Sequence, residues 1–269
     1  MGTVRSGEIE VEGRRLAWRS TGSGPPLLLV NGYGATGADW DPVLLMRLGQ
    51  EFEVICPDNR GMGGSELGNG EVTVDGMAAD LEALLDSLEI ARLPVAGWSM
   101  GGFVAQRLAL RAPRRVTQLV LLSTNPGGRE AVAPDLEVWT RLTDHSGTPR
   151  ERATRLISLL FPAALAPAID HQFGAVVAAA QAALSLDSLQ AQERAMATWH
   201  MTEQAAPGAG HPPVLIAHGE EDVVIPAANA AALAARWPGA RVERFAGCGH
   251  AFMAQEPGRL AESLSAFCN

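Results

Sequence analysis

The sequence predicts an α/β protein with a mostly parallel, eight-stranded sheet, flanked by helices and interrupted by an all-helical insertion. Strand-sized apolar runs and helical patterns alternate from residue 26 to residue 123 and again after residue 213. Such alternation is typical of parallel strands joined by crossover helices. Between these two parts, from about 129 to 211, the pattern is helical only. A chain of 269 residues with 47% hydrophobic residues is long enough for one large domain with an insertion.

The first part is expected to open with a hairpin. Two short extended segments, 8–11 and 16–21, flank Glu12-Gly13-Arg14. The continuous apolar run at 26–30 is typical of a strand buried on both faces. The elements expected after it are a helix at 40–50, a strand at 53–56, a helix at 74–88, a strand at 93–96, a helix at 100–111 and a strand at 116–123.

The alternation stops at Asn125-Pro126-Gly127-Gly128. In the insertion the candidate helices are 135–144, 150–160, 175–184 and 188–201. The sheet pattern then resumes with a strand at 213–217, a helix at 227–237, a strand at 241–245 and a closing helix at 257–267. These boundaries divide the chain into two core segments, 1–128 and 212–269, and an insertion of residues 129–211.

Composition excludes several classes of protein. A net charge of -9 and a pI near 5.2 argue against nucleic acid or an anionic membrane surface as partner. The longest apolar runs are far shorter than the roughly 18 residues that a membrane span requires. The first fifteen residues are rich in Arg and Glu and lack an apolar stretch, so no secretion signal is expected and the expected location is the cytoplasm.

The cysteines do not form a recognisable framework. Cys56, Cys248 and Cys268 are an odd number and lack metal-ligand spacing, so we expect free thiols, no disulfide and no zinc site. The expected partner is a small-molecule substrate, and the sequence predicts no particular oligomeric state.

Ser99 lies where a predicted strand meets a predicted helix, in Gly97-Trp98-Ser99-Met100-Gly101. A serine on this sharp turn exposes its Oγ, and glycines flank it because a Cβ would collide with the neighbouring strand or helix. The helix that follows directs its N-terminal N–H groups and the positive end of its dipole toward charge that forms beside that oxygen. The motif predicts a nucleophile.

Two further groups follow other predicted strands, in the order Ser, Asp, His. Asp222 follows the strand at 213–217, and His250 follows the strand at 241–245. A serine hydroxyl needs a neutral imidazole to take its proton and a carboxylate to hold that imidazole in the correct tautomer. Glu220 and Glu221 stay open as alternatives for the acid, and a turn-forming or capping role stays open for Asp222.

With these residues the chain resembles the α/β-hydrolase superfamily over almost its whole length, and least in the insertion. The matching motifs are Asn31-Gly32-Tyr33-Gly34, Asp58 to Ser65, the Ser99 turn, Gly219 to Pro226, and Gly249-His250 followed by Glu256-Pro257. Within the superfamily it is similar to capped esterases, enol-lactonases and cofactor-free haloperoxidase-like proteins. The resemblance implies an α/β-hydrolase fold in which residues 129–211 form a helical cap over the pocket.

The resemblance also implies the remaining parts of a site. The backbone N–H groups of Tyr33 and Met100 are expected to form the oxyanion hole, and neither a metal nor an organic cofactor is implied. Asn31 stands where relatives often have histidine, which implies a different anchoring of this loop. Residues that could line the substrate pocket are Gly32, Trp98, Trp139 and Phe161, with Phe173, Met196, Trp199 and Met201 as further cap residues that face either the pocket or the core.

The leading hypothesis is a serine hydrolase of small, largely apolar carboxylic esters or lactones, with Ser99, His250 and Asp222 as its catalytic residues. The same residues could support carbon–carbon bond hydrolysis or peracid formation of the haloperoxidase type. A non-catalytic receptor for a small ligand on this fold is the alternative of another class. Asp58 is interpreted as a turn residue. The other histidines are interpreted as structural or surface residues: His145, His171, His200, His211 and His218.

Overall fold

The computed structural model describes residues 4–269, so the first three residues of the predicted core segment 1–128 lie outside the described residues. The strands are β1 (Arg5–Val11), β2 (Arg14–Thr21), β3 (Pro26–Val30), β4 (Glu53–Pro57), β5 (Leu93–Trp98), β6 (Val116–Leu122), β7 (Val214–Gly219) and β8 (Arg241–Phe245). Within the described residues these eight strands form one sheet in the order β1-β2-β4-β3-β5-β6-β7-β8. β2 is antiparallel to β1 and β4, and the other pairings are parallel. The predicted fold class is confirmed.

Helices cover both faces of this sheet because its central strands are apolar on both faces. In β3, Leu28 and Val30 pack into one hydrophobic core, whereas Leu27 and Leu29 pack into the other. The first core lies under α2 (Val74–Ser87), α3 (Met100–Arg111) and α8 (Asn229–Arg236). The second lies under α1 (Pro42–Leu48) and α10 (Pro257–Cys268). We refer to these as the α3 core and the α10 core.

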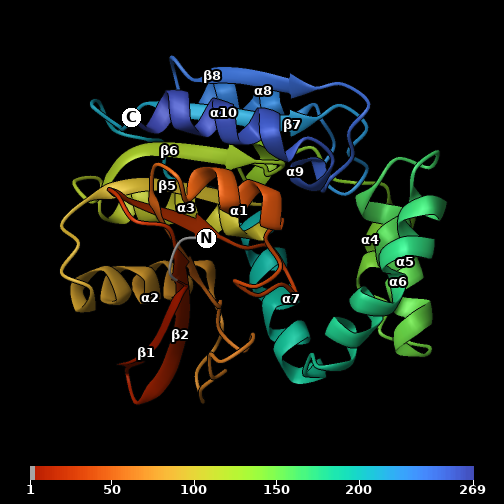
Figure 1. Ribbon diagram of the computed structural model, residues 1–269. Coiled ribbons are helices and arrows are strands. Elements are labelled where there is room, and N and C mark those ends of the chain that lie inside the picture. Colours follow the sequence, from red (N-terminus) through yellow and green to blue (C-terminus); the bar gives the residue numbers. More distant parts are fainter. Residues whose placement is uncertain (1–3) are drawn as a thin grey trace.

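The insertion is a group of helices at one end of the sheet. It contains the short η1 (Gly128–Glu130), α4 (Leu136–Leu142), α5 (Pro149–Leu160), α6 (Ala166–Ala182) and α7 (Leu186–Met201). In Figure 1 the arrows of β6 and β8 point toward α4, α5 and α6, so these helices lie at the carboxyl-end side of the sheet. Catalytic and binding groups of parallel sheets gather at this edge.

The insertion differs from the prediction in two places. α6 begins at Ala166 rather than at 175, because Pro167 lies in its first turn, where the missing N–H would have no partner within the helix in any case. The predicted helical pattern to 211 is wrong at its end, since the chain leaves the helical conformation after Met201 and returns to the sheet through a segment that contains Pro207, Gly208 and Gly210. The short helix α9 (Phe252–Gln255), directly after His250, was not predicted.

Other expectations agree with the structure. Cys56, Cys248 and Cys268 are buried and free. Asp58 accepts hydrogen bonds from the backbone N–H of Gly37 at 2.7 Å and of Gly64 at 2.9 Å, which is the predicted turn role. None of the helices in the described part of the chain is both long and apolar enough to cross a bilayer.

Candidate active site

Ser99 connects β5 to α3 and has φ 55° and ψ −123°, a conformation that L-residues rarely adopt. The flanking glycines are needed because the backbone is crowded on both sides. A Cβ on Gly97 would lie 2.2 Å from the carbonyl oxygen of Gly101, and a Cβ on Gly101 would lie 2.1 Å from that of Val30. Close packing of strand and helix therefore holds Ser99 in the strained turn that the sequence motif predicts.

Asp222 and His250 come together after β7 and β8. The Nδ1 atom of His250 lies 2.8 Å from Oδ2 of Asp222, and both side chains are almost fully buried. The other carboxylate oxygen, Oδ1, accepts hydrogen bonds from the backbone N–H groups of Val224 at 2.9 Å and Ile225 at 2.8 Å. Both oxygens of the carboxylate are therefore held in place, with Oδ2 directed at the imidazole.

A second histidine supports the same carboxylate. Nε2 of His218 lies 2.8 Å from the carbonyl oxygen of Ile225 and 3.3 Å from Oδ2 of Asp222. Because both neighbours are acceptors, Nε2 of His218 carries a proton. Burial on its own raises the pKa of Asp222, but the charge of His250 and the hydrogen bonds from His218 and His250 outweigh it and hold the pKa well below its usual value. Asp222 is therefore ionised at neutral pH.

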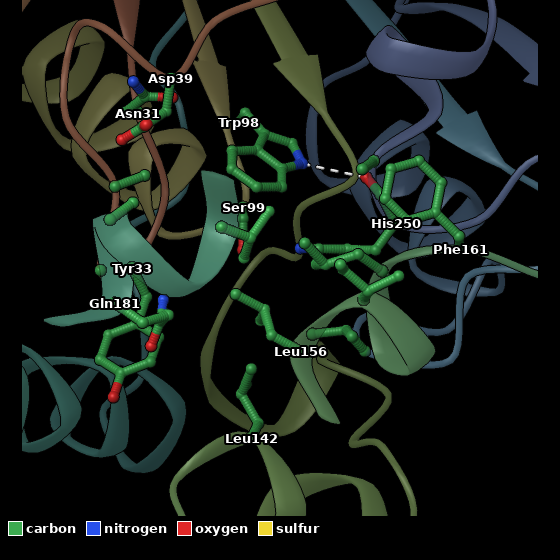
Figure 2. A pocket seen from close by; sticks show the side chains of 18 of the residues that line it. Asn31, Tyr33, Asp39, Trp98, Ser99, Leu142, Leu156, Phe161, Gln181 and His250 are labelled. Carbon is green, nitrogen blue, oxygen red and sulfur yellow. Dashed lines mark hydrogen bonds between the residues drawn. The ribbon is translucent and has the colours of Figure 1, made fainter. Parts of the chain in front are cut away.

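The two alternative acids do not reach the imidazole. Glu220 and Glu221 are exposed, and no hydrogen bond joins either of them to His250 within residues 4–269. Trp98 fixes the backbone of His250 by donating from Nε1 to its carbonyl oxygen at 3.0 Å. Figure 2 shows Trp98 bonded to His250 beside Ser99, and all three residues line one cavity.

The backbone N–H groups of Tyr33 and Met100 are the donors that the family resemblance implies for an oxyanion hole. Neither donates a hydrogen bond to another group in the described part of the chain. Met100 is the first residue of α3, so its N–H lies at the positive end of the helix dipole. Asn31 donates from Nδ2 to the carbonyl oxygen of Thr36 and accepts from Nδ2 of Asn59 at 2.8 Å, so it anchors the loop through its neighbours.

Helix α7 of the insertion forms hydrogen bonds with the loop that contains Tyr33 and Gly34. The Tyr33 hydroxyl donates to Oε1 of Glu193 at 2.5 Å, and Nε2 of His145 lies 2.7 Å from the same oxygen. The N–H of Gly34 donates to Oε1 of Gln192 at 3.0 Å. Burial, and then the hydrogen bond and charge of Glu193, raise the pKa of Tyr33 well above its usual value, so its hydroxyl keeps the proton that it donates.

In the ester hydrolase that the sequence predicts, replacing Tyr33 with phenylalanine is expected to lower kcat for a short-chain ester about tenfold with little change in KM. The substitution leaves the backbone N–H of residue 33 in place but removes the hydrogen bond from the side-chain hydroxyl to Glu193. One hydrogen bond to a charged group is worth about 1.5–3 kcal/mol. Steady-state kinetics on nitrophenyl acetate measures the effect. Arg194→Ala, an exposed neighbour on α7, is the matched control. Equal kcat values for Tyr33→Phe and the parent would show that this hydrogen bond does not position the loop.

The cavity that contains Ser99 and His250 has a volume of about 580 Å³ and is lined mainly by apolar side chains. Of the predicted pocket residues, Trp98, Trp139 and Phe161 line it, as do Phe173 and Met196. Figure 2 shows Phe161 on the His250 side of the cavity and Tyr33 on the other.

The predicted pocket residue Gly32, and two cap residues that the sequence left open between pocket and core, do not line the cavity. Gly32 does not line the cavity, because it lies against Ser99 and Trp98, where a Cβ would come within 3.1 Å of both side chains. Trp199 is buried and stacks on Phe103 with ring centroids 5.2 Å apart. Met201 is 79% exposed and does not line the cavity.

Two histidines for which the sequence indicates a structural or surface role line the cavity. They are His145, which follows α4, and His200, at the end of α7. Neither has a spacing to a sequence motif that could have identified it, because each is brought to the cavity by the packing of the insertion.

Comparisons with known proteins give a consistent result. The sequence matches the alpha/beta hydrolase fold family over residues 25–257. It is 32% identical to the pimeloyl-[acyl-carrier protein] methyl ester esterase of Nitrosomonas europaea over 246 residues, which cover 86% of this chain and 91% of that protein. It is 29% identical to the 2-hydroxymuconate semialdehyde hydrolase of a Pseudomonas species, with 97% and 92% covered. The enol-lactonase from Burkholderia xenovorans is structurally similar, with a TM-score of 0.81 at 21% identity and 97% and 99% covered.

Proposed function

The chain belongs to the alpha/beta hydrolase fold family, and on that premise we propose that it is a serine hydrolase of small, largely apolar carboxylic esters or lactones. The observation that carries the proposal is that one apolar cavity is lined by a serine on a strained turn and by a histidine whose Nδ1 is held by a buried, ionised aspartate. An esterase relative that is 32% identical over most of both chains supports the same reaction class.

In the proposed reaction Ser99 attacks the acyl carbon while Nε2 of His250 takes the proton of its hydroxyl. His250 then gives this proton to the leaving oxygen, and an acyl-enzyme forms on Ser99. In the second half His250 takes a proton from water, the hydroxide attacks the acyl carbon, and Ser99 is released with its proton restored. Asp222 keeps Nδ1 of His250 protonated and stabilises the imidazolium.

The negative charge of each tetrahedral intermediate is assigned to the N–H groups of Tyr33 and Met100. Each donor in such a site is worth roughly 3–4 kcal/mol, because it is already oriented before charge develops. Residues 129–211 are proposed to act as a cap that excludes water and shapes the pocket, and not to supply catalytic residues.

Hydrolysis of a carbon–carbon bond beside a ketone is the second candidate. It is favoured by the relative named as a 2-hydroxymuconate semialdehyde hydrolase, which is 29% identical over 97% of this chain. A panel of nitrophenyl esters of rising chain length, several lactones and a vinylogous 1,5-diketone tests both candidates. We expect esters and lactones to be turned over with the highest kcat/KM. Turnover of the diketone alone would replace the ester proposal with the second candidate, and turnover of none would contradict both.

The same panel tests the proposed cap. Replacing Trp139 with alanine is expected to raise kcat/KM for a long-chain ester relative to nitrophenyl acetate by about tenfold or more, because the lost ring leaves apolar space for the longer chain. Turnover of the acetate should remain close to that of the parent. Met201→Ala, which changes an exposed cap side chain outside the cavity, is the control. An equal loss on every ester in a folded Trp139 variant would contradict a role of this residue in selectivity.

A further inference from the structure

His200 is a polar side chain in an otherwise aromatic part of the cavity. Its ring packs edge-on against Phe103 and Trp139, with centroid distances of 5.5 and 6.3 Å. Phe103 lies on α3, one turn after Ser99. The cavity is lined by His200, Phe103, Trp139 and Ser99. His200 therefore lines the same cavity as the candidate nucleophile, although it belongs to the insertion.

Asn125 determines the tautomer of His200. The Oδ1 atom of Asn125 accepts hydrogen bonds from the N–H of Gly127 at 2.9 Å and from Nε1 of Trp199 at 3.3 Å. Since the oxygen faces two donors, the amide nitrogen is the atom that lies 3.0 Å from Nε2 of His200. An amide nitrogen only donates, so Nε2 of His200 accepts and the proton of the neutral ring resides on Nδ1.

The Nδ1–H group is left available to a ligand. Within residues 4–269 it has no hydrogen-bond partner, and it is not among the fully buried atoms that lack one, so it is an accessible donor on a side chain that lines the cavity. Burial lowers the pKa of His200, which keeps the ring neutral. A neutral N–H donor among aromatic rings is suited to an uncharged acceptor such as a carbonyl oxygen, because an anion would be poorly solvated there.

His200 and His250 contact aromatic residues that pack against opposite faces of the sheet, at the end of which Ser99 lies. His200 packs on Phe103, which belongs to the α3 core, whereas His250 packs on Trp98, which packs against the α10 core. In the proposed reaction His250 protonates the leaving oxygen, so the alcohol part of the substrate lies on the α10 side. The acyl part then extends along the α3 side, past His200.

We propose that Asn125 and His200 form a subsite for the acyl group, in which Nδ1–H of His200 donates a hydrogen bond to a second, uncharged carbonyl oxygen of the substrate. This inference rests on the proposed ester hydrolase function and narrows its substrate class to oxo-acyl esters or lactones. His200 is a specificity-determining residue in this proposal and takes no part in proton transfer to Ser99.

The test compares nitrophenyl 4-oxopentanoate with nitrophenyl pentanoate in the parent, His200→Phe and His200→Asn. For each protein, kcat/KM for the 4-oxopentanoate ester is divided by kcat/KM for the pentanoate ester. The quotient of the parent's ratio over the variant's ratio then cancels the difference in intrinsic reactivity between the two esters. We expect this quotient to be about ten or more for His200→Phe, which retains a ring but loses the donor. It should fall toward one for His200→Asn, whose amide retains a donor near the position of Nδ1. His171→Phe, an exposed cap histidine outside the cavity, should give one.

A second measurement does not depend on turnover. ¹⁵N NMR should show His200 protonated on Nδ1 only, with this signal shifting on addition of the N-propyl amide of 4-oxopentanoic acid and not of pentanoic acid. A proton on Nε2, or a quotient near one for His200→Phe, would overturn the subsite. The same quotient can be measured with 2-oxobutyl pentanoate against butyl pentanoate, in which the carbonyl is in the alcohol part. If it exceeds one for this pair and not for the two nitrophenyl esters, the acyl assignment is overturned. Absence of turnover on any ester would contradict the proposed function, and the NMR result would still decide the subsite.

Discussion

Replacing Ser99 with alanine is expected to lower kcat for esters by a factor on the order of a million while leaving the fold intact. Removing the nucleophile of a serine hydrolase abolishes covalent catalysis, and only binding and charge stabilisation remain. The expected activity of the variant is close to the uncatalysed background.

The structure indicates why the substitution should not unfold the protein. The Ser99 hydroxyl has no hydrogen-bond partner among the described residues, so its removal leaves no polar group unsatisfied there. Alanine retains the Cβ, so the strain at φ 55° is unchanged. The carbonyl oxygen of Ser99 keeps its hydrogen bonds from Thr124 Oγ1 at 2.8 Å and from the N–H of Gly102 at 2.9 Å.

Ser123 provides a matched control. It is also buried, has φ 41° and follows the neighbouring strand β6, but it does not line the cavity. A fluorophosphonate probe should label Ser99 in the parent and in Ser123→Ala, and should label nothing in Ser99→Ala. Residual kcat within about tenfold of the parent, or labelling of another serine, would contradict the assignment of Ser99.

The order and spacing of the motifs predict the neighbours that the structure shows: Ser99 and His250 line one cavity, and Asp222 contacts His250. Ser99, Asp222 and His250 each follow a strand of a parallel sheet, and the carboxyl ends of such strands meet at one edge. This local rule does not depend on the insertion. The family resemblance carried by the same motifs is confirmed by the match over residues 25–257.

The walls of the cavity were not predictable in the same way. Tyr33 and Glu193 are 160 residues apart, and Asn125 and His200 are 75 apart. Each contact depends on how α7 packs over the strand ends, and hydrophobic periodicity does not report the direction of a polar side chain at a helix end. Trp199 was left open between the pocket and the core for the same reason, because periodicity does not separate a ring that stacks on Phe103 from one that faces the cavity.

The second large effect is expected for Asp222→Asn, which should lower kcat by a factor of about 10⁴. The amide has no orientation that suits its surroundings. Its oxygen must face the N–H groups of Val224 and Ile225, which both donate to Oδ1. Its NH₂ group then faces Nδ1 of His250 and favours the tautomer in which that nitrogen is an acceptor. Nε2 of His250 would carry the proton and could not take one from Ser99.

The control variants are Glu220→Gln and Glu221→Gln, which neutralise the two exposed carboxylates of the same loop and should change kcat less than about twofold. In Asp222→Asn the amide NH₂ group also faces the protonated Nε2 of His218, so two donors face each other and some loss of stability is expected. Urea unfolding measures this loss separately from the kinetic effect. A fluorophosphonate should label Ser99 in this variant far more slowly than in the parent, because the probe requires the same proton transfer to His250. If Glu221→Gln proved more harmful than Asp222→Asn in folded protein, the acid would be Glu221, and the contact between Asp222 and His250 would have only a structural role.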